Sequence, residues 1–304
     1  MNPILKSLIQ KKRREFEELA AKQRIPEHAL DGVRQGRSIR YHQGGDPAHV
    51  MDLYCPTTAQ TPTPVIINIH GGGLITGSKD FNRHFCINLC KMGFIVFSVE
   101  HRLCPEVTFF QQLEDIYAAM NRIDGMIPEL KGDSGYCFMV SDSAGAMLAL
   151  YAAAIQRNPK LARTAGIRPC YLEIRALGLI SGMFYTTKLD PIGLVMPKVF
   201  YGPHYKKHPF YPYLNPNHEA VSMYLPPCLL TTSKHDNLRS YSYHMTAAIR
   251  LQEVPCILYD YGDDPELTHA FPVFAPEHPK SMEVTEDIAS FFTNTNKGGI
   301  IHES

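Results

Sequence analysis

The sequence has no excess of charge of either sign: its 304 residues contain 30 lysines and arginines against 30 aspartates and glutamates. A neutral chain gives no electrostatic reason to expect binding to nucleic acid or to an anionic membrane. No stretch approaches the roughly 18 consecutive apolar residues of a membrane span. Residues 1–14 also lack the apolar segment and cleavage site of a secretory signal. We therefore expect a cytoplasmic protein without nucleic-acid or membrane partners.

Sequence signatures of cofactors and metals are also missing. The glycine-rich stretch at residues 70–73 fits neither G-x-G-x-x-G nor G-x-x-x-x-G-K-[ST], which disfavours nucleotide binding. The eight cysteines are scattered, mostly in apolar segments, as is typical of buried thiols in a reducing compartment. Cys86 and Cys90 lie one helical turn apart near His84, but a metal site would need more ligands. We expect neither a cofactor nor a metal.

What the sequence does contain is a regular alternation of strand and helix patterns. Strand-like apolar segments fall near residues 64–69, 94–99, 136–140, 174–180, 228–233 and 254–261, and helical patterns fall near 80–91, 109–124, 144–157, 238–251 and 280–293. Residues 36–42 and 49–56 look like an antiparallel opening pair. With 44% hydrophobic residues the chain can bury a large core. The pattern predicts one compact α/β unit, with a mostly parallel central sheet and helices on both faces.

Two segments stand outside this alternation. Residues 3–22 carry apolar residues at helical spacing with charges between them, which predicts an amphipathic helix that covers an apolar surface. The stretch from Phe184 to Met223 is too long for a simple crossover, and we expect it to form part of a cap. Its many aromatic residues have two explanations: they pack within a surface excursion, or they line a substrate lid.

The sharpest local signal is the pentad from Ser141 to Gly145, which lies between an apolar strand pattern and an alanine-rich helix pattern. It matches the G-x-S-x-G elbow apart from Ser141, which stands at the first glycine position. A serine at the apex of such a turn presents its hydroxyl above the end of a sheet, as nucleophilic acyl transfer requires. Ser143 is therefore the candidate nucleophile.

Three consecutive glycines follow another strand pattern and His70. Glycines leave backbone N–H groups unshielded, which suits an oxyanion hole for the carbonyl that Ser143 would attack. Two later strand patterns are followed by Asp236 and His269, in the chain order serine, acid, histidine. The carboxyl ends of parallel strands lie on one edge of a sheet, so these residues should meet Ser143 there. Asp263, Asp264 and Glu266 share a loop with His269 and are alternatives for the acid.

These motifs together resemble the bacterial hormone-sensitive-lipase-like esterases of the α/β-hydrolase fold. The counterparts run in family order, from about residue 48 to 292: His70 to Gly73, His101 to Glu106, Ser141 to Gly145, Asp236 to Leu238, and His269 to Phe271. The chain departs from the family pattern at four positions. Ser141 and Ala270 replace glycines, Leu74 replaces an aromatic residue, and His101 replaces a tyrosine.

The resemblance implies a serine carboxylesterase that hydrolyses short-chain acyl esters and needs no cofactor. Ser143 would be the nucleophile, His269 the base and Asp236 the orienting acid, with oxyanion donors at Gly71, Gly72 and Ala144. Candidates for substrate contact are Leu74, Phe184, Tyr185, Phe200 and Tyr201. Alternatives are a deacetylase of acetylated sugars, an amidase or lactonase, and a non-catalytic ligand receptor, although such receptors typically lack the histidine.

The resemblance also implies how the chain is organised. Similar N-terminal helices form part of a cap in the family, so residues 1–45 are expected to be cap helices. Residues 46–183 and 225–304 would form the hydrolase core, and residues 184–224 a cap insertion, all in one compact unit. Family members often pair through an edge strand, and a homodimer is therefore an expected partner arrangement.

Overall fold

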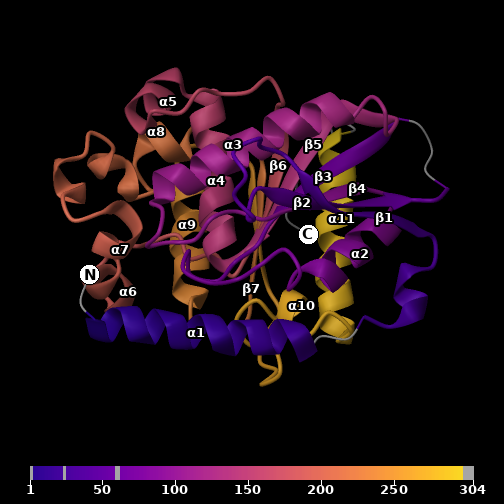
Figure 1. Ribbon diagram of the computed structural model, residues 1–304, viewed down its shortest axis with the longest axis horizontal. Coiled ribbons are helices and arrows are strands. Elements are labelled where there is room, and N and C mark those ends of the chain that lie inside the picture. Colours follow the sequence, from indigo (N-terminus) through magenta and orange to yellow (C-terminus); the bar gives the residue numbers. More distant parts are fainter. Residues whose placement is uncertain (1–2, 23–24, 59–61, 297–304) are drawn as a thin grey trace.

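The computed structural model describes residues 3–22, 25–58 and 62–296 (Figure 1). The strands are β1 (Val33–Arg40), β2 (Val50–Pro56), β3 (Thr63–Ile69), β4 (Ile95–Val99), β5 (Gly132–Asp142), β6 (Ile174–Ile180), β7 (Cys228–Thr232) and β8 (Cys256–Asp260). The α-helices are α1 (Pro3–Lys22), α2 (Arg83–Lys91), α3 (Phe109–Met126), α4 (Ser143–Arg157), α5 (Pro159–Ala165), α6 (Pro191–Val195), α7 (Pro197–Tyr201), α8 (Glu219–Ser222), α9 (Arg239–Leu251), α10 (Phe271–Phe274) and α11 (Pro279–Asn296). Short 3-10 helices are η1 (Glu27–Leu30), η2 (Tyr205–Lys207) and η3 (Tyr211–Leu214).

The eight strands form one sheet in the order β1-β2-β4-β3-β5-β6-β7-β8. β2 pairs antiparallel with both β1 and β4, and every pairing from β4 to β8 is parallel. The predicted fold class is therefore confirmed, with the opening antiparallel pair in place. The predicted strands and long helices differ from the observed ones by a few residues at their ends, while the short helix α5 was not predicted.

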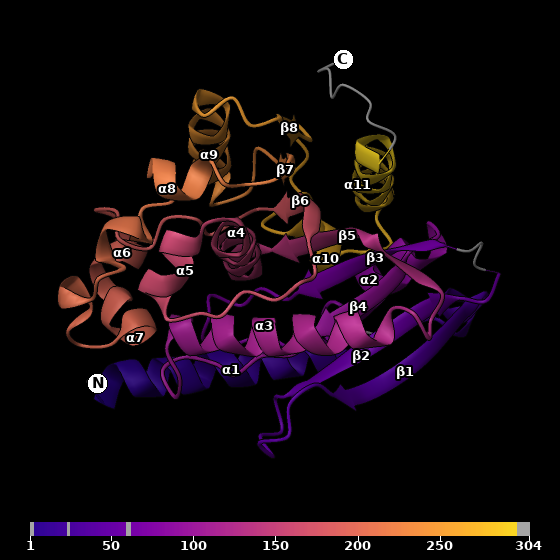
Figure 2. The same ribbon diagram turned by 90° about the horizontal axis from the view of Figure 1, so that it is seen from above.

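Helices cover both faces of the sheet because the strand residues alternate between two apolar cores. Along β3, Ile67 belongs to a core shared with α3, α4 and α9, whereas its neighbour Ile66 belongs to a core shared with α2 and α11. Figure 2 shows α3 and α4 on one side of the strands and α11 on the other. Residues 143–155 of α4 are all buried, so this helix lies inside the protein and not on its surface.

The helix α1 runs along the bottom of the molecule in Figure 1 and spans the predicted residues 3–22. It is tied to the fold by Arg13, whose guanidinium donates to the carbonyls of Ile75 at 2.7 Å and Cys104 at 2.8 Å and pairs with Glu106. Its Phe16 ring packs 6.1 Å from Phe274. The contacts place α1 against segments that follow the strand ends.

The predicted organisation needs one correction, at its first boundary. Residues 1–45 do not consist of cap helices alone, because β1 pairs with β2 along the edge of the sheet. The N-terminal helical part ends with η1 at Leu30. The segment after β6, which was predicted to form part of a cap, contains α6, α7, η2, η3 and α8, and its role as a cap stays a prediction. Residues 1–2 and 297–304 of the outer predicted ranges lie outside the described residues.

All eight cysteines are buried free thiols, as their apolar sequence context predicts. Burial raises the pKa of Cys86 and Cys90 on α2, and of Cys104 beyond β4. Among the described helices, none has the length and apolar character needed to cross a lipid bilayer.

Candidate active site

Ser143 occupies a strained turn between β5 and α4. Its φ is +49°, in the left-handed region that a non-glycine residue rarely adopts, and the residue is 8% exposed. Gly145 explains why the turn is so tight. A Cβ atom at Gly145 would lie 2.2 Å from the carbonyl oxygen of Ile69, so only glycine lets α4 approach the end of β3. The elbow predicted from the pentad is therefore present.

The structure brings the predicted serine, histidine and aspartate into one hydrogen-bonded chain. His269 Nε2 lies 2.9 Å from Ser143 Oγ, and His269 Nδ1 lies 2.8 Å from Asp236 Oδ1. Beyond the paired ends of β7 and β8, an isolated parallel bridge joins His235 to Thr268. Asp236 and His269 each follow one residue of that bridge, which is why they meet.

Asp236 is held as a carboxylate by several donors. Thr232 Oγ1 donates to Oδ2 at 2.9 Å, and the N–H of Leu238 donates to Oδ1 at 2.9 Å. Burial alone would raise the pKa of Asp236, but the hydrogen bonds and the charge of His269 bring it below its usual range. The carboxylate side chain is fully buried, while the His269 side chain is 26% exposed. This asymmetry leaves the imidazole open toward a substrate.

The three alternative acids have other partners. Asp263 is paired with Lys234 and with His235 Nε2 at the surface. Asp264 accepts the N–H of Glu266 at 3.0 Å, and Glu266 lies 3.5 Å from His278. The geometry therefore favours Asp236 as the acid beside His269.

The segment from His70 to Gly77, which we term the glycine loop, faces the elbow. Gly72 has a φ of +108°, and a Cβ atom there would lie 2.0 Å from the carbonyl oxygen of Thr76, so the turn requires glycine. The N–H of Gly71 donates to Asp142 Oδ1 at 3.0 Å. This N–H already has an acceptor in the structure, so the geometry favours other donors, and the role of Gly71 as an oxyanion donor stays a prediction. Among the described atoms, no acceptor is present for the N–H groups of Gly72, Gly73 or Ala144.

Asp142, directly before the nucleophile, is a site residue that sequence reasoning missed. Its Oδ1 also accepts a hydrogen bond from Asn82 Nδ2 at 2.8 Å. Burial raises the pKa of Asp142 above its usual value, although the bonds from Asn82 and Gly71 act in the opposite direction. The sequence could have indicated Asp142 only through its place in the elbow pentad. The G-x-S-x-G motif, however, leaves the residue before the serine unspecified.

With this geometry in place, similarity to known proteins identifies the family. A family model described as the alpha/beta hydrolase fold matches residues 66–273. The chain belongs to the alpha/beta hydrolase fold family. It is 26% identical over 250 residues to carboxylesterase NlhH of Mycobacterium tuberculosis, covering 77% of this chain and 74% of that protein. The solved structure of esterase B from Lactobacillus Rhamnosis has a TM-score of 0.87 at 24% identity, covering 96% of this chain and 95% of that one.

A probable isoprenylcysteine alpha-carbonyl methylesterase of Oryza sativa subsp. japonica is 27% identical over 146 residues, or 48% of this chain. The match spans 34% of the rice protein and 29% of an Arabidopsis thaliana relative with a similar name. The chain thus matches about a third of the length of these two curated relatives. The family membership therefore defines the fold, while the substrate has to be argued from the site.

The residues predicted to contact substrate lie deep in this α/β hydrolase. Leu74, Phe184, Tyr185, Phe200 and Tyr201 all belong to the buried core on the α3 and α4 side. The Tyr201 hydroxyl is 2.6 Å from Thr186 Oγ1, and the Tyr185 hydroxyl donates to Asn217 at 2.6 Å. The N–H of Met183 donates to the Ser143 carbonyl at 2.9 Å, which places the start of the aromatic segment beside the nucleophile. Their contact with a substrate stays a prediction.

Metal ligands are not grouped in this hydrolase, as far as the described residues extend. Within residues 3–22, 25–58 and 62–296, no cluster of three or more histidine, cysteine, aspartate or glutamate side chains is placed to hold a metal ion. His84, Cys86 and Cys90 lie on α2, packed among other buried residues.

Ser141 provides a test of how the elbow is built. Its hydroxyl is fully buried and, among the described atoms, has no hydrogen-bond partner. Removing an unsatisfied buried hydroxyl relieves a desolvation penalty of about 1 to 3 kcal/mol. We expect Ser141→Ala to raise the free energy of unfolding in urea. Ser141→Gly should gain less, because glycine costs about 0.5 to 1 kcal/mol in a strand. A loss of stability in Ser141→Ala would show that the hydroxyl has a partner after all.

Proposed function

We propose that the protein is a serine carboxylesterase that hydrolyses short-chain acyl esters. The observation that carries the proposal is the hydrogen-bonded chain from Ser143 through His269 to Asp236, at the carboxyl edge of a parallel sheet. A nucleophile, a base and an orienting acid in this arrangement constitute the machinery of acyl transfer. The similarity to carboxylesterase NlhH supports the same reaction class.

In the proposed cycle, Ser143 Oγ attacks the ester carbonyl carbon while His269 Nε2 takes the hydroxyl proton. The negative charge that develops on the carbonyl oxygen is bound by the N–H groups of Gly72, Gly73 and Ala144, which have no other acceptor among the described atoms. His269 then gives its proton to the departing alcohol. Water attacks the acyl-enzyme with His269 again as base, which releases the acid and restores Ser143.

The buried Asp236 carboxylate has two roles in this cycle. Its bond to Nδ1–H fixes the imidazole tautomer in which Nε2 is the free base, and its charge stabilises the imidazolium that forms during attack. The bonds from Thr232 and Leu238 keep the carboxylate oriented and deprotonated. Ser181 Oγ accepts the N–H of Ala270 at 3.0 Å, which anchors the backbone beside the base.

The first prediction tests the nucleophile. Ser143→Ala should lower kcat for p-nitrophenyl acetate at least about 10³-fold, because the only other serine of the elbow, Ser141, is fully buried. Labelling with a fluorophosphonate should mark Ser143 in the wild type and be lost in the variant. Circular dichroism checks that the variant is folded, and Ser141→Gly is the matched control on the same turn, expected to stay active. Hydrolysis by Ser143→Ala near the wild-type rate would refute the proposal.

A second prediction concerns the acid. Asp236→Asn should lower kcat roughly 10³- to 10⁴-fold, since an amide in place of the carboxylate favours the wrong imidazole tautomer. Asp263→Asn is the matched control: it removes an equal charge from a surface loop near the same strand ends. Its kcat should stay within about twofold of the wild type. The opposite ranking of the two variants would move the acid into the loop of His269.

The third prediction concerns acyl length. Leu74 and Phe184, which are predicted to contact substrate, are buried against their neighbours in the core, so a long acyl chain would meet packed side chains there. Each added methylene gains only about 0.8 kcal/mol of burial, which a clash soon exceeds. Among p-nitrophenyl esters from acetate to palmitate, kcat/KM should be highest for acyl chains of roughly two to six carbons. The tributyrin phosphonate named for esterase B is an inhibitor of that size class. A maximum at ten carbons or more would contradict this expectation.

A further inference from the structure

Two histidine rings lie face to face behind the glycine loop. The ring centroids of His70 and His101 are 4.2 Å apart, the ring planes differ by 8°, and both residues are 1% exposed. β3 ends just before His70, and the parallel strand β4 ends just before Glu100 and His101. The pairing of the two strands therefore creates the stack.

His70 uses both ring nitrogens as donors. Nδ1 lies 2.8 Å from the carbonyl oxygen of Gly71, and Nε2 lies 3.1 Å from Glu100 Oε1. Because both partners are acceptors, both nitrogens carry hydrogen and the ring is an imidazolium. Burial alone would lower the pKa of His70, but the carboxylate of Glu100 more than offsets this and raises it. The His70 cation thus binds the carbonyl oxygen of Gly71, while Asp142 accepts the N–H of the same residue.

His101 is in the opposite state. Its Nδ1 donates to the carbonyl oxygen of Arg102 at 3.1 Å, while its buried Nε2 has no partner among the described atoms. The ring is therefore neutral, with a lone pair on Nε2. Burial, together with the charge of His70, lowers the pKa of His101 to about 4. The ring stays uncharged at pH 7 and is protonated only below about pH 4. Protonation would place two cations 4.2 Å apart in a buried site, where their repulsion is weakly screened.

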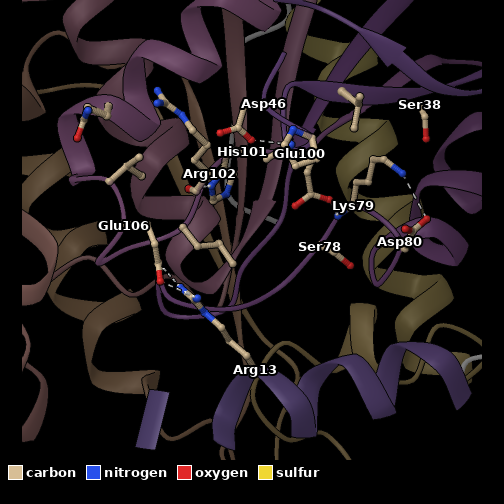
Figure 3. A pocket seen from close by; sticks show the side chains of 16 residues that line it. Arg13, Ser38, Asp46, Ser78, Lys79, Asp80, Glu100, His101, Arg102 and Glu106 are labelled. Carbon is tan, nitrogen blue, oxygen red and sulfur yellow. Dashed lines mark hydrogen bonds and ion pairs between the residues drawn. The ribbon is translucent and has the colours of Figure 1, made fainter. Parts of the chain in front are cut away.

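Solvent can reach this region from a neighbouring cavity. Glu100, His101 and Arg102 lie along the wall of a polar cavity of about 800 Å³, shown in Figure 3. The charged groups that face the two rings or line this cavity come from several elements: Glu100 and Arg102 after β4, Asp115 on α3, Asp142 at the end of β5, Lys79 and Asp80 before α2, Asp46 before β2, and Arg13 and Glu106. The lysine and arginines are each paired with a carboxylate.

We infer that His101 is a positioning residue for the glycine loop: its neutral ring stacks on His70 and so fixes the Gly71 carbonyl and the free N–H donors that follow it. The chain of contacts is continuous, from His101 to His70, to Gly71 and to Asp142 beside Ser143. The inference rests on the proposed function, because the donors affect a rate only if an oxyanion forms. Protonation of His101 is expected to disorder the same contacts.

The kinetic test uses two variants of His101 and one control. His101→Ala removes the stack and should lower kcat for p-nitrophenyl butyrate about tenfold at pH 7 with KM within about twofold, since the donors act in the transition state. His101→Phe keeps a flat, neutral ring and should restore kcat to within about threefold of the wild type. His84→Phe changes another buried histidine, on α2, and should leave both constants unchanged. A kcat for His101→Ala within twofold of the wild type overturns the inference.

The pH profile provides a readout that a merely structural role would not move. An enzyme that loses one essential base on acidification shows an acid limb of log(kcat/KM) with a slope of about one. Protonation of His101 should steepen the limb toward about two near pH 4 in the wild type and in His84→Phe, but not in His101→Phe. Activity should return when the pH is raised again, and circular dichroism checks that the fold persists. A slope of about two in His101→Phe would assign the second proton elsewhere and overturn the inference.

A measurement without turnover separates the two proposals. In protein with ¹⁵N-labelled histidine, the ring nitrogens of His70, assigned with a His70→Gln variant, should both be protonated at pH 7 in the wild type and in His101→Phe. His101→Ala should change their shifts. If the wild type hydrolyses no ester but these shifts behave as expected, the proposed function fails and the positioning role stands. Unchanged His70 shifts in folded His101→Ala would refute the positioning role whatever the activity.

Discussion

The rest of the site depends on the hydrogen bonds that the Asp142 carboxylate accepts. This carboxylate belongs to the elbow, one residue before Ser143, and it accepts the N–H of Gly71 from a strand end 71 positions earlier in the chain. Asn82 supplies a further donor to the same oxygen. Burying a carboxylate costs free energy unless the group is hydrogen-bonded. The two donors therefore stabilise the buried Asp142 together. The nucleophile and the glycine loop are thereby held as one body, with little reorganisation left for the moment of reaction.

Most of the fold, and the residues of the proposed catalytic trio, could be predicted from sequence because each depends on local order. Strands and helices follow from the alternation of apolar runs, and Ser143, Asp236 and His269 each follow a strand pattern. The oxyanion donors could not be predicted fully. Three consecutive glycines are equivalent in sequence, and only the structure shows that the N–H of Gly71 donates to the Asp142 side chain, which favours the other glycines as donors in the proposed cycle. The choice between donors is made by a tertiary contact.

The segment after β6, which we predicted to be part of a cap, shows the same limit of sequence-based prediction. An aromatic segment after β6 predicts that rings are buried, but not what they are buried against. In the structure, Tyr201 packs on Phe109 of α3, and Phe210 packs near Tyr151 of α4. The opening strand was predicted at residues 36–42, a few residues later than β1, because an edge strand exposed along much of its length has little apolar alternation to mark where it starts.

The burial of all eight thiols affects how the protein is inactivated irreversibly. In the folded state, burial keeps these groups protonated and out of reach, so oxidants and alkylating agents find little thiolate to attack. Global unfolding exposes all eight thiols at once, and their pKa values return to the usual range. In an oxidising solution the unfolded chain can then form disulfides, within itself or between chains, that no native geometry accommodates. Each unfolding event becomes a chance of irreversible loss, and the lifetime of the protein outside a reducing environment is set by its unfolding rate more than by its equilibrium stability.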